Sequence, residues 1–271
     1  MTEKVSLNES SLKKRNRFIP EYTHGEEIFN MVSHIVGGGV GIVSTVLCVI
    51  FAALHGNLYG VISSAIFGAS MIFLYTMSSI YHGLSRELNA KWVMRIMDHC
   101  TIYVLIAGTY TPIALCSVRE NNTSLGWVIF GFIWGMAALG IVLNAVNIEK
   151  FKIFSMICYI GMGWCIVGAW KITAAALGIG GVVFLLTGGL AYTVGAVFYA
   201  FGKKRRYIHS VFHLFVVAGS ILHFFCIFFC GNSDTRNGYF LAYNRINTSG
   251  KSDLYRPPHL AAVQGCQYTD K

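Results

Sequence analysis

Seven long apolar runs constrain the fold of this chain more than any other feature of its sequence. Each holds about twenty predominantly apolar residues, the length that an α-helix needs to cross a hydrocarbon core about 30 Å thick. They lie at residues 32–54, 58–81, 97–117, 125–146, 153–171, 177–201 and 208–230. Because hydrocarbon offers no partner for backbone N–H and C=O groups, each run is expected to be helical. The sequence therefore predicts an all-α membrane protein with a seven-transmembrane helix bundle.

The distribution of charge supports this class and divides the chain. Charged residues make up only 12% of the sequence, whereas soluble domains have about 25%. We expect a polar N-terminal segment at 1–27, a transmembrane domain at 28–230 and a flexible polar tail at 231–271. The predicted localisation is integral and multi-pass, in the plasma or cell membrane.

Positive charges predict the orientation of the bundle. Lysine and arginine are concentrated in the N-terminal segment and after the second, fourth and sixth runs, at Lys4, Lys13, Lys14, Arg15, Arg17, Arg86, Lys91, Arg95, Lys150, Lys152, Lys203, Lys204, Arg205 and Arg206. The opposite loops carry only Arg119 and, at a helix end, Lys171. Since cytoplasmic loops are the ones enriched in lysine and arginine, the N-terminus is predicted to be cytoplasmic and the C-terminus extracytoplasmic.

Charge and cysteine content exclude two other classes. The net charge of +9 is explained by the lysine and arginine expected on the cytoplasmic side of a membrane protein. The sequence shows no basic soluble module interleaved with aromatic residues, so nucleic-acid binding is not expected. The eight cysteines contain no CxxC and mostly lie within apolar runs, so they are interpreted as core residues. Membrane lipids are the expected environment and substrate, and no protein partner is indicated.

Five polar residues of the apolar runs are predicted to meet at one depth. Ionisable groups within membrane helices are costly and usually functional. Ser78 and His82 end the second run, Asp98 opens the third, and His209 and His213 open the seventh. The predicted orientation places all of these positions at the cytoplasmic ends of their helices.

Their spacing suggests a metal site. His209 and His213 share a helix face because they are four residues apart, and His82 can supply a third nitrogen from a neighbouring helix. Three histidines and one open position form the tetrahedral arrangement of catalytic zinc. Asp98 could hydrogen-bond a water there or orient an imidazole, and Ser78 could add another hydrogen bond. The alternative is that these groups only join helices through hydrogen bonds.

The other histidines of the runs are given local roles. His223 lies ten residues beyond His213, about 15 Å along a helix, and cannot reach the same ion. It is expected to be buried and hydrogen-bonded to a neighbour. His34 and His99 are likewise expected to be local structural residues.

At these residues the chain resembles the hemolysin III branch of the progestin and adiponectin receptor family, over residues 24–230. The matching stretches are Glu26-Glu27 with Asn30 and His34, Ser78-Ser79-Ile80-Tyr81-His82, Asp98-His99, Ile102-Tyr103, Leu105-Ile106-Ala107-Gly108-Thr109-Tyr110-Thr111-Pro112, and His209-Ser210-Val211-Phe212-His213 with His223 downstream. The resemblance implies Zn²⁺ held by His82, His209 and His213, with Asp98 and Ser78 contacting the water on the metal.

The leading functional hypothesis is a zinc-dependent hydrolase of lipid amide or ester bonds, similar to the related alkaline ceramidases. Asp98 would be the general base, and Ser78 would orient water or stabilise an oxyanion. A pore-forming or cytolytic hemolysin is the first alternative. The second is a receptor-like protein with a structural zinc.

Overall fold

The computed structural model describes residues 19–55, 57–201 and 205–230, and every regular element in these ranges is a helix. The elements are α2 (His24–Leu54), α3 (Leu58–Gly83), α4 (Asn89–Pro112), η1 (Ile113–Val118), α5 (Arg119–Asn121), α6 (Thr123–Trp164), η2 (Cys165–Ala169), α7 (Trp170–Phe201) and α8 (Ile208–Cys230). The tail predicted at 231–271 and most of the polar segment predicted at 1–27 lie outside the described residues.

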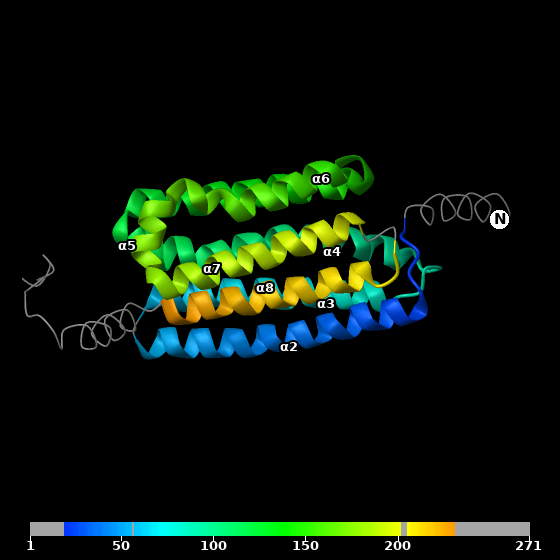
Figure 1. The fold of residues 1–271 in the computed structure, drawn as a ribbon, viewed down its shortest axis with the longest axis horizontal. Coiled ribbons are helices and arrows are strands. Elements are labelled where there is room, and N and C mark those ends of the chain that lie inside the picture. Colours follow the sequence, from blue (N-terminus) through cyan, green and yellow to red (C-terminus); the bar gives the residue numbers. More distant parts are fainter. Residues whose placement is uncertain (1–18, 56, 202–204, 231–271) are drawn as a thin grey trace, which may run out of the picture.

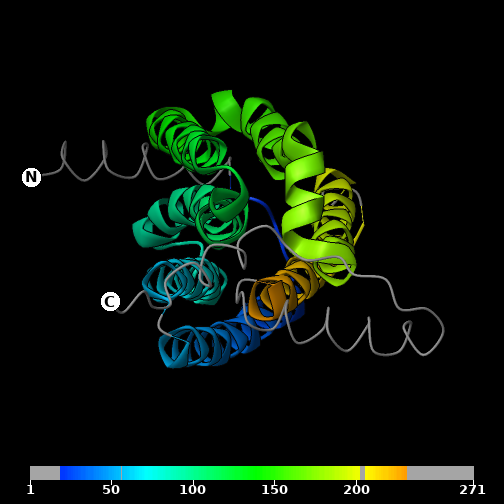
Figure 2. The same cartoon turned by 90° about the vertical axis from the view of Figure 1, so that its left-hand side faces the viewer.

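The long helices run side by side along one axis (Figure 1). Seen along that axis they form a ring, in which the chain passes from α2 through α3, α4, α6 and α7 to α8 (Figure 2). The last helix closes the ring, because α8 packs against both α7 and α2. Helices from opposite ends of the sequence are therefore neighbours.

Five helical stretches are long and apolar enough to cross a membrane: His24–Leu54, Leu58–Gly83, Asn89–Asn121, Thr123–Phe201 and Ile208–Phe229. Large apolar side chains point outward along them, such as Ile35, Val43 and Val142, each more than half exposed. An exposed apolar belt of this kind fits hydrocarbon and not water. The prediction of an all-helical, multi-pass membrane protein is confirmed at this level.

The fourth stretch is interrupted twice. It has 79 residues, which as one straight helix would extend about 120 Å, several times the thickness of a bilayer core. The backbone leaves helical geometry at Asn147, with φ −161° and ψ 92°, and at Gly178, with φ 67° and ψ 178°. The second conformation is open essentially to glycine alone. Both breaks lie between predicted runs or at their edge.

The start of α2 is fixed to the start of α8. Thr23 caps α2 in a capping box with Glu26, whose Oε2 accepts hydrogen bonds from the Thr23 backbone and hydroxyl at 2.8 and 2.7 Å. The other carboxylate oxygen of Glu26 accepts a hydrogen bond from the backbone N–H of Tyr207 at 2.7 Å. Because Tyr207 immediately precedes α8, this carboxylate holds the two helix starts together.

Glycine allows α2 to approach α3 closely. A methyl group at Gly37 would lie 2.8 Å from the Tyr75 ring, and one at Gly41 would lie 3.2 Å from Met71. Tyr75 is buried there, and its hydroxyl donates to Ser220 Oγ on α8 at 2.7 Å. The glycine-rich stretch of the first run thus serves helix packing at these positions.

Pro112 ends α4, and the 6 residues that follow it form the π-helix η1. Proline has no N–H to donate and its ring crowds the preceding turn, so the wider π-helical turn is a common local response.

Candidate metal centre

Three buried histidines meet where α3 ends and α8 begins. His82 lies in the last turn of α3, while His209 and His213 lie one turn apart near the start of α8. One ring nitrogen from each lies within 4.8 Å of the other two. The Nε2 atoms of His209 and His213 are 3.0 Å apart. The structure thus brings together the three histidines that the sequence predicted as ligands.

The residues present fit a zinc ion. Buried polar atoms nearly always have a hydrogen-bond partner, yet Nε2 of His82 is buried without one in the described part of the chain. Imidazole nitrogens are preferred zinc ligands, and three of them leave a fourth tetrahedral position open. This buried histidine triad could therefore bind a metal.

Ser78 and Asp98, the other predicted site residues, line one cavity together with His209 and His213. Ser78 is fully buried one turn before His82, and its hydroxyl is buried without a hydrogen-bond partner among the described residues. The Asp98 side chain is 16% exposed and lies 3.8 Å from Nδ1 of His99. The fold therefore places a carboxylate and a hydroxyl beside the histidines, while their catalytic roles stay predictions.

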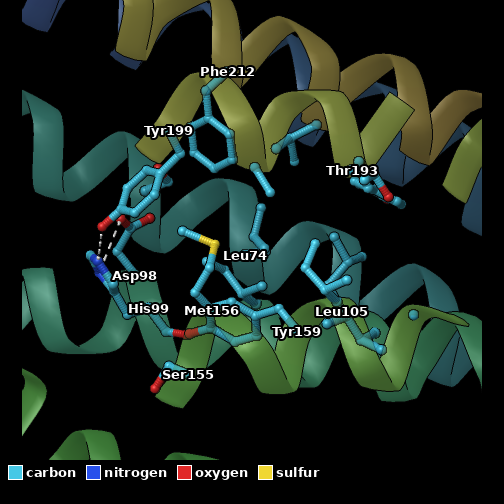
Figure 3. A pocket seen from close by; sticks show the side chains of 18 of the residues that line it. Leu74, Asp98, His99, Leu105, Ser155, Met156, Tyr159, Thr193, Tyr199 and Phe212 are labelled. Carbon is cyan, nitrogen blue, oxygen red and sulfur yellow. Dashed lines mark hydrogen bonds and ion pairs between the residues drawn. The ribbon is translucent and has the colours of Figure 1, made fainter. Parts of the chain in front are cut away.

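The cavity has a volume of about 150 Å³ and is lined mainly by apolar side chains. Asp98, His99 and Tyr199 cluster at one end, Thr193 and Leu105 lie at the other, and Met156 and Leu74 lie between them (Figure 3). A second hollow of about 360 Å³ meets the first at its polar end, because both are lined by Asp98, His99, Tyr199 and His209. His209 thus lines both hollows where they meet, together with Asp98, His99 and Tyr199.

Tyr22 covers the histidines from the segment that precedes α2. Its ring stacks on His209 with centroids 4.8 Å apart and an interplanar angle of 18°. Burial raises the pKa of the Tyr22 phenol well above its usual value, and nearby tyrosine and carboxylate groups raise it further. The phenol therefore stays neutral at physiological pH.

Two other groups contact the triad and a third contacts one of them, and the sequence alone did not assign these groups to the site. Glu27 Oε2 lies 2.5 Å from Nδ1 of His82, and Lys91 Nζ lies 2.6 Å from Oε1 of Glu27. His34 Nε2 lies 2.6 Å from Nδ1 of His213. The expectation that His34 has only a local role therefore misses its contact with a predicted ligand. The available signal was the spacing of Glu27, Asn30 and His34, which places them on one helix face.

Of the other two histidines of the apolar runs, His223 has the expected bond to a neighbour, while His99 bonds Tyr199 on α7 and lines the cavity. His223 donates from Nε2 to the carbonyl oxygen of Leu185 at 3.2 Å. His99 hydrogen-bonds Tyr199 Oη at 3.0 Å and the carbonyl oxygen of Arg95 at 2.9 Å.

Similarity to known proteins agrees with this arrangement. The family described as "Haemolysin-III related" matches residues 22–224. A hemolysin-3 homolog of Bacillus subtilis (strain 168) is 38% identical over 208 residues, which cover 77% of this chain and 95% of that protein. Hemolysin-3 of Bacillus cereus is 38% identical over 204 residues, or 75% of this chain and 91% of that protein.

The chain is also similar, at lower identity, to an animal protein. The monocyte to macrophage differentiation factor of Homo sapiens is 27% identical over 214 residues, which cover 76% of this chain and 80% of that protein. It is a member of the progestin and adiponectin receptor family. The buried histidines, the all-helical membrane fold and these similarities together show that the chain belongs to the haemolysin-III-related branch of the progestin and adiponectin receptor family.

Proposed function

We propose that this protein is a zinc-dependent membrane hydrolase that cleaves amide or ester bonds of lipids. The observation that carries the proposal is the convergence of three buried histidines beside an apolar cavity that also contains a carboxylate. Such a combination is needed to hold a metal, accept a proton and accommodate a hydrocarbon chain in one place.

The proposal includes seven membrane crossings with a cytoplasmic N-terminus. The backbone breaks at Asn147 and Gly178 would divide Thr123–Phe201 into three crossings. Together with the other four apolar stretches these make seven, in agreement with the apolar runs. The concentration of lysine and arginine in alternate loops would place the histidines near the cytoplasmic leaflet.

His82, His209 and His213 would hold the zinc. Bound zinc lowers the pKa of water to about 7 and polarises a carbonyl group. The Asp98 carboxylate would accept the proton of the attacking water as general base. The Ser78 hydroxyl would donate a hydrogen bond to the oxygen on which negative charge develops. Tyr22 would limit access of bulk water to His209 from the cytoplasmic side.

The cavity suggests the kind of substrate. Its apolar lining includes Leu74, Ile102 and Leu105. Such a surface favours an acyl or alkyl chain over a polar metabolite, because burying apolar area is stabilising by roughly 25 cal/mol per Å². A lipid could enter sideways from the bilayer and place its carbonyl group near the histidines.

Metal analysis and lipid turnover test the proposal together. Purified wild-type protein is expected to contain about one zinc per chain and to hydrolyse a lipid amide or ester, and His82→Ala should lose both properties. His223→Gln serves as the control for metal content, since this histidine is also buried on α8 but bonds Leu185. Equal turnover by wild type and His82→Ala would refute the hydrolase.

The names of the bacterial relatives support a second candidate, a cytolytic membrane protein. Release of a trapped dye from liposomes would identify this activity, in particular if it persists in His82→Ala. Bound zinc without either lipid turnover or dye release would instead indicate a receptor-like protein with a structural metal.

A further inference from the structure

We propose that α2 supplies a set of outer hydrogen-bond partners that orients two of the three histidines of the metal centre. Glu27 would orient His82, and His34 would orient His213. The inference rests on the proposed metal site. It assigns to α2, which carries none of the three ligands, the role of orienting two of them.

The first contact is a chain of three groups, in which a partly buried carboxylate lies between two buried side chains. The Glu27 carboxylate can only accept hydrogen bonds, so the Nδ1 atom of His82, 2.5 Å away, carries the hydrogen and donates it. In a neutral imidazole this leaves the lone pair on Nε2, which is the buried atom of His82 that has no partner in the described residues. Glu27 therefore determines which nitrogen of His82 is available to an ion.

Lys91 keeps this carboxylate in place. Its side chain is 1% exposed, and its ammonium group donates to Oε1 of Glu27 at 2.6 Å and to the carbonyl oxygen of Leu84 at 2.8 Å. The two oxygens of Glu27 thus have different partners, one on the histidine and one on the lysine. Rotation of the carboxylate would break both contacts.

The second contact repeats the arrangement on α8. Nδ1 of His213 lies 2.6 Å from Nε2 of His34, and Nε2 of His213 faces Nε2 of His209 at 3.0 Å. With the hydrogen on Nδ1 donated to His34, the Nε2 lone pair of His213 points toward the other ligands. His34 is itself held in place, because it is 3% exposed and its ring meets Tyr75 edge-on at 5.0 Å.

One helix can serve both ligands because of its place in the ring. Glu27 and His34 are seven residues apart and so lie on the same face of α2, two turns from each other. This helix packs against α3, which carries His82, and against α8, which carries His213. The hydrogen bond from Tyr207 to Glu26 fixes the position of this face relative to α8.

The inference predicts the metal affinity of α2 variants. Loss of an outer partner of a metal-bound histidine typically weakens metal affinity by about 10- to 100-fold. We expect a loss of this size for Glu27→Gln, because a carboxamide has one acceptor oxygen for two donors. Glu21→Gln is the control for the loss of an acidic charge: the Glu21 side chain is exposed and pairs with Arg86, not with a ligand histidine.

The experiment measures zinc affinity in detergent by competition with a chromogenic chelator, without lipid. Glu27→Gln and His34→Ala should bind zinc about 10- to 100-fold more weakly than wild type, and Glu21→Gln should match wild type. Should Glu27→Gln fail to fold, Glu27→Asp is expected to show the same loss, since its shorter side chain keeps the charge but withdraws the oxygen.

The outcomes separate this inference from the proposed function. Wild-type protein that binds no zinc would overturn both. Zinc binding by wild type with equal affinities for Glu27→Gln and Glu21→Gln would overturn the inference alone. Cobalt(II) can report the ligand set through its visible absorption. A His34→Ala protein with an altered cobalt spectrum and a loss far above 100-fold would identify His34 as a direct ligand and refute its outer role.

Discussion

Ser78 and His82 lie one turn apart on α3, and each has a buried polar atom without a hydrogen-bond partner among the described residues. By contrast, two other buried groups nearby have partners. Lys91 bonds Glu27 and Leu84, and Tyr75 bonds Ser220. Since burial of an unpaired polar group costs about 1–3 kcal/mol, unpaired atoms that face the other histidines mark a place where a ligand would stabilise the protein.

Asp98 allows the clearest test at this scale. Asp98→Asn keeps the size of the side chain but cannot accept a proton, so lipid turnover is expected to fall by about 10²- to 10⁴-fold. Zinc content should be unchanged, because all three histidines remain. The measurement is turnover beside metal analysis on the same preparation. Unchanged turnover would remove Asp98 from the role of base, and loss of zinc would make it a ligand.

At the scale of elements, α2 connects the two helices that carry the histidines. Its first turn is capped by Thr23 and tied to Tyr207, its middle meets Tyr75, and its face carries Glu27 and His34. Tyr75 also donates to Ser220 on α8. A change in the distance between α2 and α3 should therefore disturb both the packing and the site.

Two glycines of α2 test this coupling. A methyl group at Gly37 would lie 2.8 Å from the Tyr75 ring, whereas nothing lies within 4 Å of one at Gly39. Gly37→Ala is expected to lower the free energy of unfolding by about 1–3 kcal/mol through overpacking. Gly39→Ala should leave it equal or slightly higher, because alanine favours a helix. Thermal unfolding in detergent measures both, and equal loss in the two variants would contradict the close approach.

At the scale of the whole molecule, the ring of helices brings functional side chains from distant parts of the sequence together at one end of the bundle. Glu27 and His82 belong to the first two long helices, α2 and α3, and His209 belongs to the last, α8, yet they are neighbours because α8 packs against α2. The same ring surrounds an apolar cavity that begins beside the histidines. The exposed outer surface of the helices is also apolar, which suits lipid on the outside.

The proposed orientation predicts the behaviour of fusion proteins in a bacterial host. Alkaline phosphatase fused after residue 230 should be active, because it folds only outside the cytoplasm, and green fluorescent protein at the same point should be dark. Fusions after residue 201 should behave in the opposite way, since an odd number of crossings separates the two points. Active phosphatase after residue 201 would contradict the orientation.

The sequence by itself determined the class of the fold and the three histidines. Apolar runs and the spacing of His209 and His213 are local properties, and in a bilayer every backbone group must bond within its own helix. The same local information, together with the charges of the loops, was enough to predict a common depth for His82 and the two histidines of α8. His223 was expected to be buried and bonded to a neighbour, and it bonds the carbonyl oxygen of Leu185 on α7.

The tertiary structure decided which side chains face one another around the ring. Glu27 and His34 could not be assigned to His82 and His213 from the sequence, because the contact depends on which helices are neighbours and how each is rotated. Tyr22 was missed for the same reason, since the course of the chain before α2 brings its ring onto His209. The depth of a residue along a membrane helix follows directly from its position in the sequence. Which helices are neighbours around the bundle depends on packing between helices that are distant in the sequence. No periodic pattern in the sequence records this packing.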